Sequence, residues 1–256
     1  MSFFSLLGVE FQKIRRSKIM LILAAAVIAL WLPSIFNADI NFQMQEEGIS
    51  PEYNFLIQGF LAMSWFIFPA SMVVSTVLIN QTERSNKGIL KMLALPISTA
   101  QLCIAKFVVL LSLAAVQVLM SVGMYYLSAA IVTGTQDYNF ILPPLFVFKE
   151  AGLLLASSIP MLTFFWLLSV CIQTPIFSIG IGLASIVPSV LMINTKIWFA
   201  YPMAYPFFVV TAEYGKIAAN LSMTQVELIP LLPAAACITA ICLLAACSCF
   251  GKAERR

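Results

Sequence analysis

The stretch QTERSNKGILKMLALPISTAQLCIAK, residues 81 to 106, is the only long polar and basic interruption between two segments that are each apolar enough to span a bilayer. A short helix is predicted in it, with one basic face and an apolar face formed by Ile89, Leu90, Leu93 and Leu95. Pro96 restricts the residue before it to extended conformations and so ends this helix. Ser98 and Gln101 have the spacing of a capping box, which begins the next helix. The stretch is therefore predicted to be a short transverse helix, a sharp break and the start of a membrane helix.

The composition of the whole chain excludes a soluble globular protein. Of its 256 residues 61% are hydrophobic and only 10% are charged, whereas soluble domains carry about 25% charged residues. The net charge of +3 is too small to indicate binding to nucleic acid. The chain has no histidine and no CxxC pair, so it lacks the signature of a metal site. An all-α, polytopic membrane protein is the predicted fold class.

Six apolar segments have the length of a membrane span, because a helix rises 1.5 Å per residue and the hydrocarbon core is about 30 Å thick. They cover residues 19–35, 58–80, 107–132, 151–172, 176–193 and 229–250. Residues 2–18 carry an amphipathic stripe followed by a basic cluster, which predicts a helix lying in the inner membrane interface. No linker separates these segments, so residues 1–256 are predicted to form a single transmembrane domain.

The charged residues are sorted between the segments that connect the spans. Both chain ends and residues 81–106 together hold 11 of the 14 basic residues and 3 of the 11 acidic ones. Residues 37–57 hold four acidic residues and no basic one. Because basic residues concentrate on the cytosolic side of membrane proteins, both termini and residues 81–106 are predicted to be cytosolic.

Residues 194–228 form the longest segment outside the predicted spans, and this segment is rich in aromatic side chains. Two interpretations are open. The segment either forms one or two helices that dip into the outer interface, or it is an aromatic belt that anchors its neighbours. Aromatic rings with polar edges favour this depth, which suggests contact with lipid or with a membrane-bound substrate for Trp198, Tyr201, Tyr205, Phe208 and Tyr214.

The interiors of the predicted spans contain no Asp, Glu, Lys, Arg or His. Secondary transporters usually place ionisable groups at this depth to bind the coupling ion. The chain also lacks the GxxxxGK[ST] phosphate loop, so it is not expected to hydrolyse ATP itself or to bind a cofactor. Energy is then expected from a separate polypeptide. Residues 81–106 are either the handle for that partner or an ordinary solvated loop.

The order of residues in this connector resembles a known family. Residues 83–106 fit the pattern E-R-x-x-x-G-x-L-x-x-L-x-x-P-I-S-x-x-Q-L-x-x-A-K, which is similar to the first cytosolic loop of ABC-type permeases of the type-2 exporter class. Residues 6–19, LLGVEFQKIRRSKI, are similar to the entry of the lantibiotic-immunity and peptide-antibiotic permeases. The resemblance implies that residues 86–95 form the coupling helix that rides on an ATPase. The predicted coupling residues are Glu83, Arg84, Asn86, Lys87, Gly88, Leu90, Lys91, Leu93 and Leu95.

These features lead to one functional prediction and one alternative. The chain is expected to be the permease subunit of an ABC exporter in a bacterial plasma membrane, in contact with membrane lipids and not itself an enzyme. A dimer of cytosolic ATP-binding subunits would hold ATP and Mg, and a second permease subunit, the same or a different chain, would complete the transporter. The resemblance implies an antimicrobial peptide of the lantibiotic type as substrate, removed to give immunity. The alternative is a membrane sensor or assembly protein that docks a cytosolic partner through residues 81–106.

Overall fold

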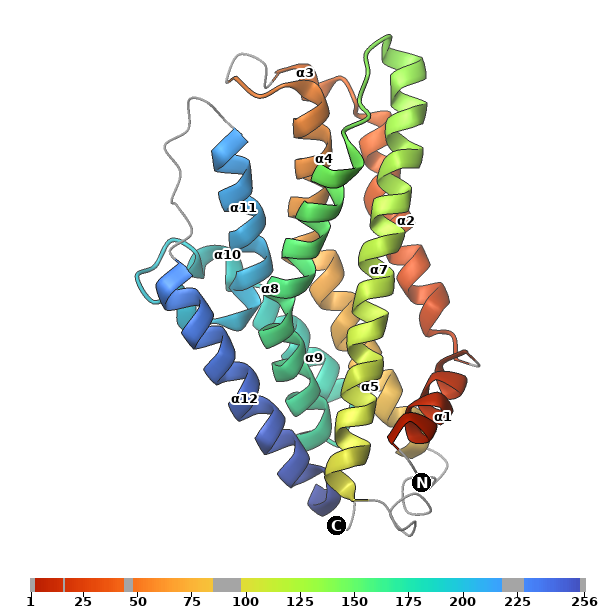
Figure 1. Ribbon diagram of the computed structural model, residues 1–256, viewed down its shortest axis with the longest axis vertical. Helices are drawn as coiled ribbons and strands as arrows, with labels where there is room; N and C mark the ends of the chain where they lie inside the picture. Colours follow the sequence, from red (N-terminus) through yellow and green to blue (C-terminus); the bar gives the residue numbers. More distant parts are fainter. Residues whose placement is uncertain (1–2, 16, 44–47, 85–97, 218–227, 254–256) are drawn as a thin grey trace.

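A computed structural model describes residues 3–15, 17–43, 48–84, 98–217 and 228–253 of the chain, and it is all-α over these residues (Figure 1). In chain order the elements are α1 (Phe3–Arg15), α2 (Ile19–Phe36), α3 (Ile40–Gln43), α4 (Pro51–Ala62), the π-helical turn η2 (Met63–Ile67), α5 (Phe68–Arg84), α7 (Thr99–Gln136), α8 (Pro144–Cys171), α9 (Pro175–Ile186), α10 (Ser189–Met192), the 3-10 turns η3 (Trp198–Ala200) and η4 (Pro202–Ala204), α11 (Tyr205–Ile217) and α12 (Leu228–Ala253).

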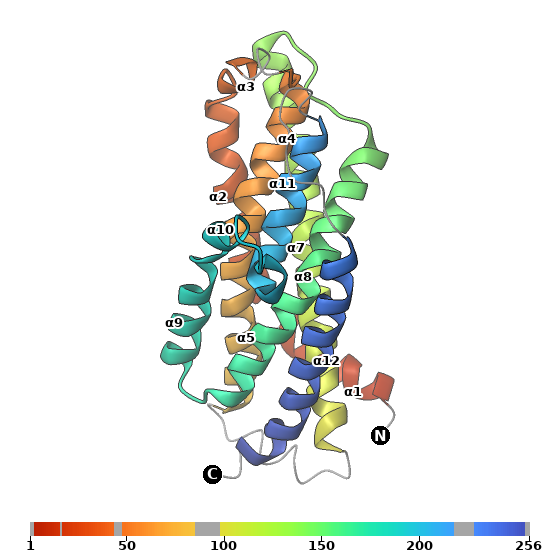
Figure 2. The same cartoon turned by 90° about the vertical axis from the view of Figure 1, so that its left-hand side faces the viewer.

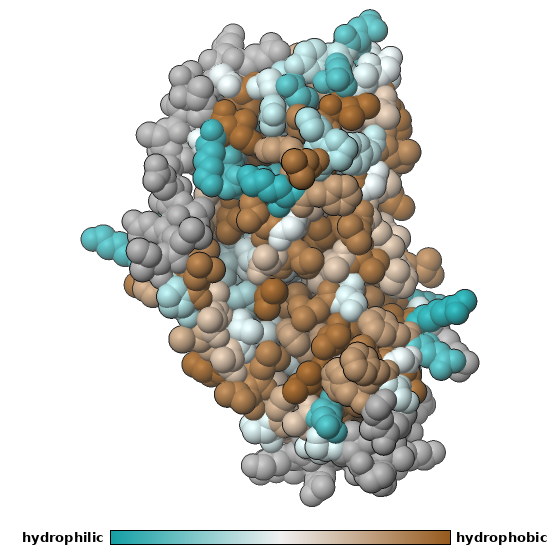
Figure 3. Space-filling view, viewed as in Figure 1, coloured by the Kyte–Doolittle hydropathy of each residue, from teal (hydrophilic) through white to brown (hydrophobic). Residues whose placement is uncertain are grey.

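The described residues include six helices that are long and apolar enough to cross a membrane, which confirms the predicted number. α4, η2 and α5 follow one another without a break as the second of these six spans. α7 and α8 occupy the middle of the bundle: α2 and α12 pack against α7, and α11, α12 and α5 pack against α8 (Figures 1 and 2). α9 packs mainly against α5. A broad apolar band covers the face shown in Figure 3, with hydrophilic side chains gathered above and below it.

Two spans begin earlier than predicted, because their helices continue past the apolar segments. α4 begins at Pro51 and not at residue 58, with proline at its first position, where a missing N–H costs nothing. α8 begins at Pro144 and not at residue 151. α7 begins at Thr99, directly after Ser98, as the predicted capping box requires; it runs for 38 residues to Gln136 and ends where Asp137 adopts a left-handed φ of 48°. A helix of that length is about 57 Å long, so part of it must project beyond a hydrocarbon core of about 30 Å.

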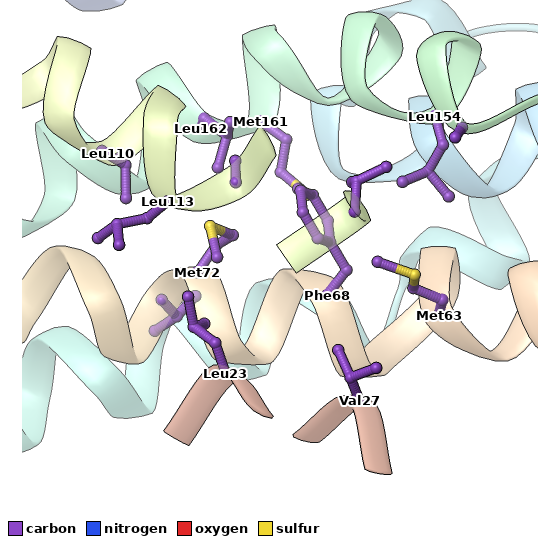
Figure 4. Packing of buried hydrophobic residues seen from close by; sticks show 14 of the residues in the cluster. Leu23, Val27, Met63, Phe68, Met72, Leu110, Leu113, Leu154, Met161 and Leu162 are labelled. Atoms are coloured by element: carbon purple, nitrogen blue, oxygen red, sulfur yellow. The ribbon is translucent and has the colours of Figure 1, made fainter. Parts of the chain in front are cut away.

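The core lies between α5, α7 and α8 and is mostly aliphatic. Figure 4 shows Met72 of α5 pointing toward Leu113 of α7 and Leu162 of α8, with Phe68 beside Met161. These side chains are buried, as the apolar centre of a helix bundle requires. The core therefore joins the three longest spans into one packed unit.

Some of the buried polar side chains form hydrogen bonds between helices. Ser71 Oγ donates to Gln117 Oε1 at 2.7 Å, between α5 and α7. Trp31 Nε1 donates to Ser121 Oγ at 2.9 Å, between α2 and α7. Such interhelical hydrogen bonds replace the water that a lipid environment does not supply.

The close approach of α4 to α2 depends on Gly59. A Cβ atom at this position would lie 2.5 Å from Cη2 of Trp31, whose side chain is fully buried. The indole ring is rigid and has no room to move, so any larger residue would push the two helices apart. Gly59 thus sets the distance between the first and second spans.

Candidate functional site at the basic end of the bundle

The predicted coupling segment joins α5 to α7 at one end of the bundle, which we call the basic end. It comprises α1, the last turns of α5, α8 and α12 and the first turns of α7, so the first and last helices lie at the same end (Figures 1 and 2). The basic side chains of Lys13, Arg15, Arg84 and Lys106 are located here. Residues 85–97 lie outside the described residues, and with them the predicted coupling residues Asn86, Lys87, Gly88, Leu90, Lys91, Leu93 and Leu95; the side chain of Glu83 is also not described. The flanking helices, α5 and α7, are described apart from the Glu83 side chain.

Arg84, the last residue of α5, is held by the C-terminal end of α8. Its guanidinium donates to the carbonyl oxygens of Ser169 at 3.2 Å, Val170 at 3.3 Å and Ile172 at 3.4 Å. The last carbonyls of a helix have no partner within it and carry partial negative charge, so a cation is favourable there. Arg84 is among the residues predicted from the sequence to couple to an ATPase. In this structure its guanidinium caps α8, and contact with a partner stays a prediction.

A second set of polar contacts lies just above Arg84 on the same face of α5. Asn80 Nδ2 donates to Ser169 Oγ at 2.7 Å, and Ser169 Oγ donates to the carbonyl oxygen of Thr76 at 3.1 Å. All three side chains are buried. Thr76, Asn80 and Arg84 follow at intervals of four residues, which places them on one side of the helix. The end of α5 is therefore fixed to the end of α8 over two helical turns.

α7 begins on the other side of the segment, and its first turns are fixed to α1. Ser98 Oγ accepts a hydrogen bond from the backbone N–H of Gln101 at 3.2 Å, which confirms the predicted serine cap. Lys106 Nζ lies 3.0 Å from Glu10 Oε2. These side chains are almost inaccessible, with exposed fractions of 1% and 4%. Lys13 Nζ contacts the other oxygen of Glu10 at 2.6 Å.

The ion pair of Glu10 and Lys106 was not predicted. The predicted amphipathic stripe of residues 2–18 includes Phe4 and Phe11, and these are 81% and 41% exposed. α1 instead turns Leu6 and Glu10 toward the bundle. The exposed phenylalanines leave an apolar face for the membrane interface, as expected of an interfacial helix. The available signal in the sequence was Glu10 itself, an acidic residue in an otherwise basic helix.

The aromatic segment at the other end of the bundle is folded against the protein. Part of it forms α11, which runs alongside α8 and α4 (Figure 1). Tyr205, Phe208 and Tyr214 are buried, so in this structure they contact protein and not the surroundings. Trp198 stacks on Phe208 with ring centroids 3.9 Å apart, and Tyr201 donates to the carbonyl oxygen of Ser185. Contact of Trp198 or Tyr201 with lipid or peptide stays a prediction.

Charged residues join α11 to α8 at this end. Lys149 Nζ lies 3.2 Å from Glu150 Oε1 and 3.1 Å from Glu213 Oε2, and Lys216 also pairs with Glu213. Burial alone would raise the pKa of Glu213, but the hydrogen bonds from Lys216 and Lys149 outweigh it and hold the pKa below its ordinary value. Glu213 is therefore ionised at neutral pH and fixes α11 to α8.

Comparison with known proteins identifies the family of the chain. The model of a family described as "ABC-2 family transporter protein" matches residues 6–189, more than half of the chain. The chain belongs to the ABC-2 family of transporter proteins. The matched region of this ABC-2 permease includes Glu10, Lys106, Arg84 and the end of α8, and it leaves α11 and α12 outside. Neither a curated protein nor a solved structure matches the chain.

Membership of the ABC-2 family establishes the general role of the chain. It is a multi-pass protein of the plasma membrane and the permease subunit of an ABC transporter, which works with an ATP-binding subunit. This finding favours transport over the sensor or assembly protein considered above. Within the part of the chain that the structure describes, no three His, Cys, Asp or Glu side chains are grouped to hold a metal ion.

Proposed function

We propose that this ABC-2 permease is the membrane subunit of an exporter that removes antimicrobial peptides of the lantibiotic type, driven by a dimer of cytosolic ATP-binding subunits. One observation supports the coupling step above all others. The helices on both sides of residues 85–97 are tied into the bundle by polar contacts: buried ones join Asn80 to α8 and Lys106 to α1, and partly buried ones join Arg84 to α8. A force applied to this segment would reach two further helices directly.

The proposed transmission follows from the cost of breaking these contacts. In an apolar environment a buried charge or amide that loses its partner is strongly destabilised, so the contacts hold while the helices move together. ATP and Mg bind in the partner subunit, and residues 86–95 pack into a groove on it. Displacement of this segment would then carry α5 with α8, and α7 with α1, as two units. Export follows from the relative motion of these units.

The peptide path is proposed to lie between two permease subunits, the same or different chains. The centre of a single chain is filled by side chains of α5, α7 and α8. A cavity of about 610 Å³ lies on the outside of the bundle between α2, η2 and the end of α9, and its wall includes Leu30, Trp65, Phe66 and Val187. Trp65 and Phe66 are more than 40% exposed. A second subunit on this face would enclose the cavity, and its aromatic wall suits apolar side chains of a peptide.

The coupling step is tested by substitutions in the segment itself. Leu90→Ala and Leu93→Ala are expected to abolish peptide resistance, because truncation of a packed interface residue costs roughly 1 to 2 kcal/mol or more. Lys87→Ala is the matched control and should be nearly silent, since a charge at the rim of an interface contributes mainly to encounter. Copurification of the ATP-binding subunit and membrane insertion are measured for each variant. Full resistance in both leucine variants at normal abundance would remove the segment from the mechanism.

The substrate is tested separately, with the unmodified transporter. The permease and its ATP-binding subunit are expressed in a susceptible strain, and growth is measured against a lantibiotic, a linear cationic peptide and a small apolar drug. The proposal predicts protection against the lantibiotic, and its loss when the ATP-binding subunit cannot hydrolyse ATP. Protection against the drug alone would overturn the peptide assignment and leave the coupling step intact.

A further inference from the structure

A second cavity lies between α8, α11 and α12, away from the basic end and from the cavity beside η2. Its volume is about 400 Å³. Its wall is mainly apolar and includes Leu153, Ala156, Pro160, Val209, Leu231 and Ala235. Leu232, which also lines it, is 61% exposed, so the cavity is open toward the surroundings of the bundle. We call it the lateral groove.

The mouth of the lateral groove is charged, and its charges are arranged in two layers. The carboxylates of Glu150 and Glu213 are nearly buried, with side-chain exposures of 7% and 11%. The side chains of Lys149 and Lys216 are 55% and 57% exposed and lie over them. A molecule that arrives from outside therefore meets two ammonium groups first. Each ammonium group is already oriented by a carboxylate, so the two ammonium groups are held in fixed positions.

The length of the lateral groove matches half of a bilayer. Lys149 and Pro160, at its two ends on α8, are eleven residues apart, which corresponds to about 16 Å along a helix. Val170, whose carbonyl oxygen accepts from Arg84, lies twenty residues after Glu150 on the same helix. This separation corresponds to about 30 Å, which is the thickness of the hydrocarbon core. No charged residue lies between them. The groove therefore extends from the polar boundary opposite the basic end to about the middle of the membrane.

We propose that the lateral groove binds one anionic phospholipid from the leaflet opposite the basic end. The phosphate group contacts the ammonium groups of Lys149 and Lys216, and one acyl chain lies along the apolar wall. The two lysines and two glutamates carry no net charge together, but the accessible side chains are the lysines, so a cationic amphiphile fits less well. A zwitterionic lipid lacks the net charge that the two ammonium groups favour.

Bound lipid would act as a bridge between three helices. α11 and α12 lie outside the region that matches the family model, and both contribute to the groove together with α8. The lipid would join the three helices at a position where α11 is otherwise held to α8 by the ion pair of Lys149 and Glu213. The site would thus make the packing of the C-terminal quarter of the chain dependent on the surrounding membrane.

The test measures lipid retained by the purified protein in native mass spectrometry, with phosphatidylglycerol and phosphatidylcholine offered in equal amounts. The proposal predicts preferential retention of one phosphatidylglycerol. Lys216→Gln should reduce this retention about fivefold, the effect of one lysine near an anionic lipid, whereas Lys196→Gln, a change at an exposed lysine outside the groove, should not. Equal retention of both lipids by the unmodified protein would overturn the proposal.

The acyl chain is tested by filling the groove. Ala235→Phe places a ring in the apolar wall and should abolish retention, while Ala236→Phe, at the adjacent exposed position, should leave it unchanged. In the unmodified protein, phosphatidylglycerol with a photoreactive acyl chain should label peptides that contain residues 153–160 or 231–235. Labelling only elsewhere, or displacement of the lipid by inorganic phosphate alone, would show that no acyl chain occupies the groove and would contradict the proposal.

Discussion

Substitution of Glu10 tests the docking of α1 on the transporter core. Its carboxylate lies 3.0 Å from the ammonium of Lys106 and 2.6 Å from that of Lys13. Lys106 is 1% exposed and Lys13 is 29% exposed. Removal of one partner from a buried ion pair costs about 3 to 5 kcal/mol, whereas an exposed pair contributes at most about 1 kcal/mol. Glu10→Gln should therefore lower the free energy of unfolding by about 3 to 5 kcal/mol, and Lys13→Met by less than about 1 kcal/mol.

The double variant Glu10→Gln/Lys106→Met makes the test specific. Removal of both members of the buried pair leaves neither of them as an uncompensated buried charge, so the double variant should be more stable than Glu10→Gln alone. Lys106→Met alone should cost less than Glu10→Gln, because Lys13 still neutralises the carboxylate. Unfolding is titrated with SDS in mixed micelles and followed by tryptophan fluorescence. Equal losses in Lys13→Met and Glu10→Gln, or no loss in either, would refute the reasoning.

Two further predictions concern packing and topology. Gly59→Ala should destabilise the protein by about 1 to 3 kcal/mol, because the new Cβ would lie 2.5 Å from the Trp31 ring; Gly123→Ala, with no atom within 4 Å, should be neutral or slightly stabilising in the same SDS titration. In a background without native cysteines, a cysteine at Glu47 should react with an impermeant reagent added outside the cell, and a cysteine at Lys87 should not, because the basic segments are predicted to be cytosolic. Reaction of the cysteine at position 87 alone would show that the topology is the reverse of the predicted one.

The number and order of the spans could be predicted because apolar length and charge sorting depend on local sequence. The starts of α4 and α8 could not, because a charged residue such as Glu52 or Lys149 ends an apolar segment without ending the helix. α4 and α8 continue past these residues. The two charged side chains have partners at the end of the bundle opposite α1: Glu52 accepts from Tyr138, and Lys149 pairs with Glu213. The sequence marks the membrane boundary and not the helix boundary.

The candidate site could be predicted only in part. The helix cap at Ser98 depends on neighbouring residues and was predicted, and it is confirmed. The contacts of Arg84 and Lys106 join residues about 85 and 96 positions apart, and no local pattern specifies which helix end a basic side chain will meet. The burial of Tyr205 and Tyr214 could not be predicted either, since aromatic composition does not distinguish a membrane belt from a packed helix.

The central claim is that residues 86–95 of this ABC-2 permease contact an ATP-binding subunit. It is tested most directly by site-specific photocrosslinking in the native membrane, with a photoreactive amino acid at Leu90 or Leu93. A third variant, with the same group at Asp137 beyond the far end of α7, is the control. The account predicts a crosslinked product that contains the ATP-binding subunit from Leu90 and Leu93 and none from Asp137. A product from Asp137, or none from either leucine while the subunit copurifies, would contradict it.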